Sequence, residues 1–347
     1  MKKKDDFSVV PDEIFPIEDD PFPNLTSSEI EIDGREFYND PGEKFLFSAE
    51  PFTKFTFPRK VTASQVLSYS DGETDYKVMA VENFPYGRNA RLALFWLVRE
   101  ALRRQRYFGV TSTLKEHDPD AYLTALNNAR RIPIPDCSNN YLLRNIVTPG
   151  HPEDSAEAIS ASNLRNSVIE QLRAIFNLAI YPDPKSGAGV NFHMGETWDI
   201  PVSRQSTDAK IYNYDQGSGL FQMPDKTFIK LTTNAFPLDQ EMISHLMEDT
   251  IAIDLYTMLV NEMGNNCNQK AKITLDYKRL TQVLFPDFDD PEDSVPSPSE
   301  MKERIINAFS LIAERAPALM MVLQPDRLEF SGSLPPTQSV VDIFENH

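Results

Sequence analysis

Amide and guanidinium side chains are the candidate recognition groups in this sequence. They recur at helical spacing in the segment 162–180, as Asn163, Asn166, Arg173 and Asn177. Arg and Asn are the side chains that pair bidentately with the edges of guanine and adenine in the major groove of DNA. The pattern therefore indicates a helix that reads DNA bases. A solvated helix face without a partner is the alternative.

A helix that reads bases also needs phosphate contacts around it. Four cations lie where the edge of this helix and a following β-wing could supply them: Arg165, Lys185, Arg204 and Lys210. A second candidate is the last helix of the chain, which offers Lys302 and Arg304 among several glutamates. We expect these residues and the four of the first helix to form the DNA-binding set.

The charge balance argues against generic affinity for nucleic acid, because 34 basic against 52 acidic side chains give a formal net charge of −18. The two ends of the chain hold most of this excess, and the segment from Arg88 to Arg106 is a local exception with six arginines and one acid. That cluster fits a helix C-terminus, where cations meet the negative end of the helix dipole. An acidic interaction protein or regulator, such as a DNA mimic, is therefore the alternative to a DNA-binding protein.

Motifs for catalysis are missing from the sequence. It has no phosphate-binding loop and no Gly-x-Ser-x-Gly elbow, and none of its five histidines has metal-ligand spacing with another His or Cys. We therefore expect no enzyme, no cofactor and no metal. With two cysteines, no apolar run of about 18 residues and no signal peptide, a cytoplasmic protein is expected that does not enter the membrane.

Hydrophobic periodicity and the Pro and Gly breaks predict the helices and strands that carry these residues. Residues 1–44 read as an irregular acidic arm and 45–60 as an extended stretch that docks onto the first domain. Helices are expected over 89–105, 119–131, 162–180, 239–247, 250–263, 276–284 and 300–315. Strands or hairpins are expected over 62–82, within 183–235 (including 227–232), at 272–275, and at 320–323 with 327–330.

The order is three helices and β-hairpins, then four helices and a hairpin, and each half resembles a winged helix, in which three helices are followed by a β-wing. A faint internal echo at a shift of 162 residues, Ala90 on Ala252 and Leu97 on Leu259, agrees with a duplication. The expected fold is α+β and mainly α, with tandem winged-helix domains behind an irregular acidic N-terminal arm. The predicted parts are an arm at 1–60, winged-helix domains at 61–235 and 236–336, and a tail at 337–347.

Two sequence blocks resemble RepA-type plasmid replication initiators. The first is Phe84-Pro-Tyr-Gly-Arg-Asn-Ala-Arg-Leu-Ala-Leu-Phe-Trp-Leu-Val-Arg-Glu-Ala, which is similar to the opening helix of that family. The second is the stretch from Leu231 to Met263, with Phe236-Pro-Leu-Asp before a helix and Ala252-Ile-Asp-Leu-Tyr in the next. The helix from Glu300 and the hairpin that ends at Pro335-Pro336 also fit the C-terminal end of the family.

The resemblance implies tandem winged-helix domains that bind double-stranded DNA at directly repeated sites of a plasmid origin. It also implies recruitment of host replication proteins, and a homodimer, since dimerisation is common among similar initiators. None of the matching motifs is catalytic.

Overall fold

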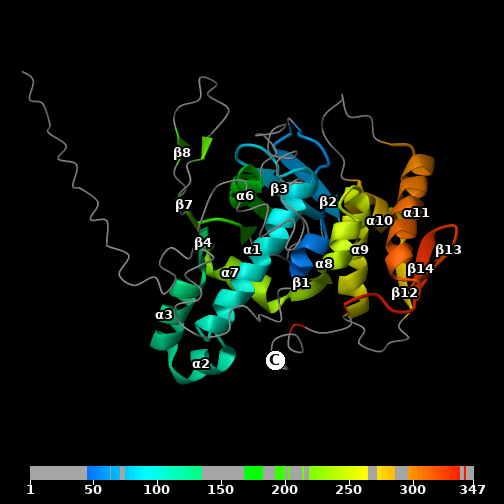
Figure 1. Ribbon diagram of the computed structural model, residues 1–347. Helices are drawn as coiled ribbons and strands as arrows, with labels where there is room; N and C mark the ends of the chain where they lie inside the picture. Colours follow the sequence, from blue (N-terminus) through cyan, green and yellow to red (C-terminus); the bar gives the residue numbers. More distant parts are fainter. Residues whose placement is uncertain are drawn as a thin grey trace, which may run out of the picture. The chain divides into compact units, whose positions relative to one another are not determined.

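The computed structural model describes residues 45–62, 64–70, 75–134, 168–182, 192–199, 202–203, 213–214, 219–264, 272–285, 296–336 and 340 (Figure 1). All of them belong to one unit. The described part is a mixed α+β fold, in which helices pack on several small antiparallel sheets. The expected fold class is confirmed at this level, and the tandem winged-helix arrangement stays a prediction.

The first half of the fold is built around one long central helix. Helix α1 (Gly87–Tyr107) is buried on nearly every side because its apolar residues surround the axis, and it contacts α3, α6, α7 and β1. The other described helices of this half are shorter: α2 (Ser112–His117), α3 (Pro119–Ala129), α6 (Val168–Phe176) and α7 (Asp225–Thr233). The side chains of Thr111 and Asp118 cap α2 and α3 by accepting backbone N–H bonds.

Two antiparallel sheets accompany these helices. The larger has the order β2-β3-β5-β6, with strands Val66–Ser70, Asp75–Ala80, Leu178–Pro182 and Phe192–His193. The smaller has the order β4-β10-β7, with strands Arg131–Ile134, Gly219–Gln222 and Thr197–Asp199. Between β7 and β10 in the sequence, β8 (Val202–Ser203) pairs with β9 (Asn213–Tyr214) as a separate ladder.

The second half begins with β11 (Ala235–Asp239) and consists of helices with one three-stranded sheet. Its helices are α8 (Gln240–His245), α9 (Thr250–Gly264), α10 (Tyr277–Leu284) and α11 (Pro298–Arg315). Strands β12 (Ile273–Asp276), β13 (Met320–Leu323) and β14 (Arg327–Ser331) form the sheet in the order β12-β14-β13. Helices α9 and α11 lie side by side (Figure 1). Asp239, Asp276 and Ser297 cap α8, α10 and α11.

The segment that precedes both halves belongs to the core. Strand β1 (Phe45–Ala49) pairs with β11 over five residues, and the short 3-10 helix η3 (Glu50–Thr53) follows it. Phe47, Phe52, Phe55 and Phe57 are all buried. Residues 45–60 are expected to dock onto the first domain; they contact α1 there, but β1 pairs with β11 and η3 contacts α9, both in the second half. Residues 1–44 lie outside the described residues.

Two expected elements differ in the structure. The helix expected over 162–180 ends at Phe176, because residues 178–182 form β5 and pair with β3 in the middle of a sheet. The β-type run 227–232 lies within helix α7, where Phe228 and Leu231 are fully buried at helical spacing. In both segments tertiary packing overrides the local composition.

The other predicted helices and the terminal hairpin occur in the structure with end shifts of a few residues. The predicted domain boundary at 235/236 falls inside β11, the strand that pairs with β1. The division into domains stays a prediction. Within the described part of the chain, no helix has both the length and the apolar character to cross a membrane.

Candidate nucleic-acid interface

The described part of the first predicted reading helix is mostly buried. Six of the nine residues of α6 are buried, since the helix packs against α1. Among them, Gln171 accepts a hydrogen bond from the backbone N–H of Tyr86 at 2.8 Å. Most side chains in the described turns of this helix therefore pack in the core.

Arg173 and Asn177 are the predicted base-reading residues that the structure describes on this helix. The guanidinium of Arg173 pairs with Glu82 at 2.8 Å, and its side chain is 16% exposed. Asn177 follows the helix end, and its carbonyl accepts the N–H of Val81. Arg173 would have to release Glu82 before it could read a base. Six other predicted residues lie outside the described residues: Asn163, Arg165, Asn166, Lys185, Arg204 and Lys210.

Helix α11 carries the second predicted pair, Lys302 and Arg304, and both are exposed. The helix begins with a capping box, in which the Ser297 side chain accepts the N–H of Glu300 and the Glu300 carboxylate accepts the N–H of Ser297. These hydrogen bonds from Ser297 lower the pKa of Glu300. The inner face of α11, with Ile305, Ala308 and Ile312, packs toward α9.

The outward line of α11 is polar and of mixed charge. At helical spacing it runs through Glu303, Asn307, Ser310 and Glu314, and all four are exposed. Towards its C-terminal end, the imidazole Nε2 of His245 on α8 lies 3.2 Å from both the Leu311 carbonyl and the Glu314 carboxylate. The last turns of α11 are thus held by α8, and its first turns present Lys302 and Arg304 to solvent.

The charge of the described residues differs sharply from that of the whole chain. They contain 23 Lys and Arg and 23 Asp and Glu side chains, so they are formally neutral. The remaining residues contain 11 basic and 29 acidic side chains, which is the entire net charge of −18. In 272–285 and 296–336, the part with α10, α11 and the sheet, seven basic residues face six acidic ones.

Most arginines of the cluster on α1 form ion pairs or hydrogen bonds within the fold. Arg88 pairs with Glu248 at 2.9 Å, and Arg103 pairs with Glu100 at 3.3 Å. Arg104 is buried and donates to the carbonyls of Asn128 and Ala129. Burial opposes ionisation of Glu100, but Arg103 and Arg99 outweigh it and hold the pKa of Glu100 below its usual value. The cluster therefore offers little free charge to a polyanion.

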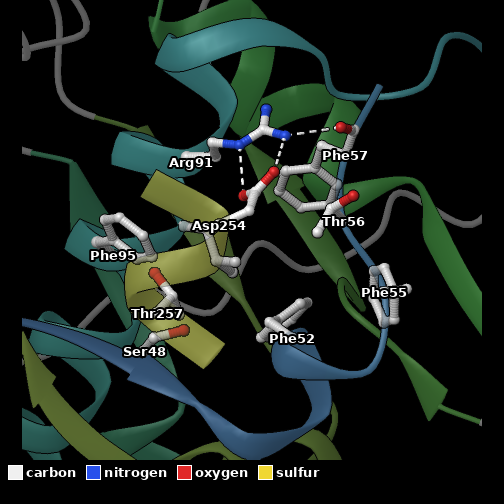
Figure 2. Close-up of a pocket in the computed structure, with 10 residues that line it drawn as sticks. Ser48, Phe52, Phe55, Thr56, Phe57, Arg91, Phe95, Asp254 and Thr257 are labelled. Atoms are coloured by element: carbon white, nitrogen blue, oxygen red, sulfur yellow. Dashed lines mark hydrogen bonds and ion pairs between the residues drawn. The ribbon is translucent and has the colours of Figure 1, made fainter. Parts of the chain in front are cut away.

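Arg91 and Asp254 form a buried, bidentate ion pair between α1 and α9 (Figure 2). Arg91 Nε donates to Asp254 Oδ1 at 2.6 Å, and Arg91 Nη2 donates to Asp254 Oδ2 at 2.5 Å. The guanidinium also donates to the carbonyls of Gly87 and Phe57, each at 2.8 Å. Burial raises the pKa of the Asp254 carboxyl, whereas the Arg91 guanidinium lowers it.

This pair joins the two sequence blocks on which the resemblance rests, since Arg91 lies in the Ala-Arg-Leu block and Asp254 in the Ala-x-Asp-Leu-Tyr block. Tyr256 of the second block is also buried, and its hydroxyl accepts the N–H of Asp239 and donates to the carbonyl of Pro335. Burial raises the pKa of Tyr256. These motif residues hold the fold together. The sequence signal for this role is an isolated charge within an apolar helical run.

A small cavity of about 20 Å³ lies beside the ion pair. Residues 48–57, α1 and α9 all contribute to its wall, and Figure 2 shows Ser48, Thr257 and Phe95 around it. This volume is room for about one water molecule. The Ser48 hydroxyl is fully buried and has no protein partner among the described residues. Across the described ranges, no three His, Cys, Asp or Glu side chains are grouped as metal ligands would be.

Comparisons with known proteins do not assign a family. No family model matches the chain, and no curated protein matches it. Two crystal structures of domains 2 and 3 of RctB align with 82% of this chain and 96% of theirs, at 10% sequence identity and with TM-scores of 0.47 and 0.43. At this level the alignments establish neither a family nor a function. The resemblance to RepA-type initiators stays a prediction.

Proposed function

We propose that this chain is a plasmid replication initiator that binds repeated origin DNA sites through winged-helix units, without catalysis of its own. The observation that carries the proposal is the order of elements from α9 to β14. Helix α9, strand β12, helices α10 and α11 and the hairpin β13–β14 follow one another in the chain. In the sheet, β14 lies between β12 and β13. That order is typical of a winged-helix unit.

In a winged-helix unit the helix before the hairpin enters the major groove, as the second helix of a helix-turn-helix does. Helix α11 occupies that position, with α10 as the helix before it. Lys302 and Arg304 stand exposed near its N-terminal end, which suits contacts to phosphates beside the groove. Asn307, one turn further on, is the exposed amide that suits base contact.

The first half supports a second unit of the same kind. Its small sheet has the order β4-β10-β7, again first, third, second along the chain. The ladder β8–β9 falls between β7 and β10, where a wing belongs, and Arg204 and Lys210 lie between β8 and β9 in the sequence. These two cations are the phosphate contacts proposed for that wing.

The charge distribution favours DNA binding over the alternative of a DNA mimic. A mimic needs an acidic surface on its folded part, and the described fold is neutral with 23 charges of each sign. A neutral described part, with Lys302 and Arg304 exposed on α11, is compatible with DNA binding by an acidic chain.

The test is binding of the full chain to labelled duplexes that contain direct repeats, against scrambled duplexes, over a series of salt concentrations. The variant Lys302→Gln/Arg304→Gln should bind about 10-fold more weakly and lower the salt slope by about one per lost phosphate contact. Lys226→Gln, an exposed lysine on α7, is the matched control. Equal binding by the variant and the control would refute the role of α11.

Host replication proteins and a homodimer, which the resemblance implies, belong to the same proposal. Sedimentation velocity of the full chain with and without repeat DNA measures the oligomeric state. If the dimer dissociates on binding, the complex contains one chain per repeat. If it binds intact, the complex contains two chains, so the measured mass distinguishes the two cases.

A further inference from the structure

One segment, Phe45–Thr62, connects the two halves of the fold, and we call it the clasp. Its strand β1 pairs with β11 and packs against α1, and its short helix η3 contacts α9. The N–H of Glu50 donates to Asn234, and the Pro58 carbonyl accepts the N–H of Gly87, the first residue of α1. The clasp therefore contacts α1 in the first half and both β11 and α9 in the second.

The clasp also caps the end of α10. Thr56 Oγ1 donates to the carbonyl of Val283 at 2.8 Å, and Arg59 Nη2 donates to the carbonyl of Leu284 at 2.7 Å. Both carbonyls belong to the last turn of α10, where they have no partner within the helix. The Arg59 guanidinium lies 4.5 Å from the centre of the Phe285 ring. A cation at this end also meets the negative end of the helix dipole.

Thr56 connects this cap to the first half. Its carbonyl accepts a 2.5 Å hydrogen bond from the Tyr69 hydroxyl on β2, while its hydroxyl holds α10. The next residue, Phe57, gives its carbonyl to Arg91 of the buried ion pair. Two adjacent clasp residues thus bind α1, β2 and α10, so that α10 cannot turn relative to α1 without breaking buried hydrogen bonds.

We infer that the clasp fixes the angle and distance between the two halves, and that Thr56 and Arg59 are positioning residues for DNA spacing. This inference rests on the proposed function, in which each half contacts its own segment of a repeat. One inserted base pair turns the second segment by about 35° around the DNA axis, since a helical turn is about 10–10.5 bp. A rigid joint penalises such an insertion and a loose joint tolerates it.

The test uses the full chain with Thr56→Val/Arg59→Gln, which removes both caps on α10 and keeps the buried volume of Thr56. The matched control is Thr232→Val/Lys226→Gln on α7, where the Thr232 hydroxyl donates to the Phe228 and Ile229 carbonyls of its own helix. Hydrogen exchange should become at least about 10-fold faster in α10 of the clasp variant and stay unchanged in α1. The control should leave exchange in α10 unchanged.

Duplexes with zero to five base pairs inserted between the two segments of a repeat give the second measurement. The unmodified chain and the control should lose at least 10-fold in affinity at one or two insertions. The clasp variant should lose less than about 3-fold and keep its affinity for the uninterrupted repeat within about 2-fold. A clasp variant with the spacing profile of the control would overturn the inference and leave the proposed function intact.

If the unmodified chain binds no repeat DNA, the proposed function fails, and the inference about DNA spacing fails with it. The exchange experiment still reports on the joint itself in that case. Unchanged exchange in α10 would show that Thr56 and Arg59 do not hold α10 at all.

Discussion

Removing the charge of Asp254 should be among the most destabilising single changes in this fold. The Arg91–Asp254 pair has side chains that are 3% and 9% exposed, and Arg91 donates four hydrogen bonds to three acceptor groups. Asp254→Asn keeps the size of the side chain but leaves a buried guanidinium that cannot lose its proton. Breaking a buried pair from one side costs about 3–5 kcal/mol. At roughly 2–4 °C per kcal/mol, the melting temperature should fall by roughly 6–20 °C.

The reverse change, Arg91→Met, leaves a buried carboxyl that can be neutralised. Burial raises the pKa of Asp254 above its ordinary value of 3.8, and without Arg91 the Arg59 guanidinium is the remaining group that lowers this pKa. Because the folded state then holds the proton more tightly than the unfolded state, stability falls as the pH rises from about 3.8 through the raised pKa. The Arg91→Met variant should therefore be more stable near pH 5 than near pH 8, relative to Asp254→Asn.

Urea unfolding of Arg91→Met, of Asp254→Leu and of Arg91→Met/Asp254→Leu completes a double-mutant cycle. The loss of unfolding free energy in the double variant should be smaller than the sum of the losses in the two single variants, by at least about 1.5 kcal/mol. The reason is that apolar side chains of similar volume replace the ion pair. Additive effects, or a loss below about 1 kcal/mol for Asp254→Asn, would show that the pair does not join α1 and α9 as the geometry indicates.

Three further changes test other parts of the structure. The arginines around Glu100 hold its pKa below 4.5, so the unmodified chain should lose stability as the pH falls through that lowered pKa, and acid titration should show a flatter profile for Glu100→Gln. Gly332 has a φ of +107°, and a Cβ there would lie 1.9 Å from the Ala318 carbonyl oxygen, so Gly332→Ala should cost more than about 2 kcal/mol in thermal unfolding. Glu82→Gln removes the ion pair of Arg173 with Glu82, so repeat DNA should bind more tightly if Arg173 reads a base; a loss of stability with unchanged binding would assign Arg173 to structure.

Helix α11 and the terminal hairpin show where sequence reasoning succeeds. The apolar positions Met301, Ile305, Ala308 and Ile312 repeat at helical spacing behind a Ser and Pro start, and the strands flank Pro325-Asp326. Both signals are local, so the elements form where the pattern places them. The same holds for α9 and α10, whose starts follow Asp residues.

The ends of α6 and the identity of α7 depend on contacts from distant parts of the chain. The residues from Leu178 to Tyr181 continue the apolar stripe of α6, yet they pair with β3, which lies about a hundred residues earlier. Similarly, the Thr-rich run in α7 has the composition of a strand, but Phe228 and Leu231 pack into the core as one helix face. No local pattern contains that information.

The arginine-rich helix α1 shows why a basic cluster in the sequence did not locate the candidate DNA-binding site. A net positive cluster in a sequence predicts a polyanion surface only if its charges remain free, and here Arg91 and Arg104 are buried while Arg88 and Arg103 hold carboxylates. The spacing cannot distinguish these cases, because the partners of Arg88 and Arg91 lie about 160 residues away. Cations that pair internally release no counterions on DNA binding, so they add nothing to the salt slope. A slope close to the number of exposed cations on α10 and α11, plus the two cations Arg204 and Lys210, would therefore agree with an interface there, and a much steeper slope would require α1 to open.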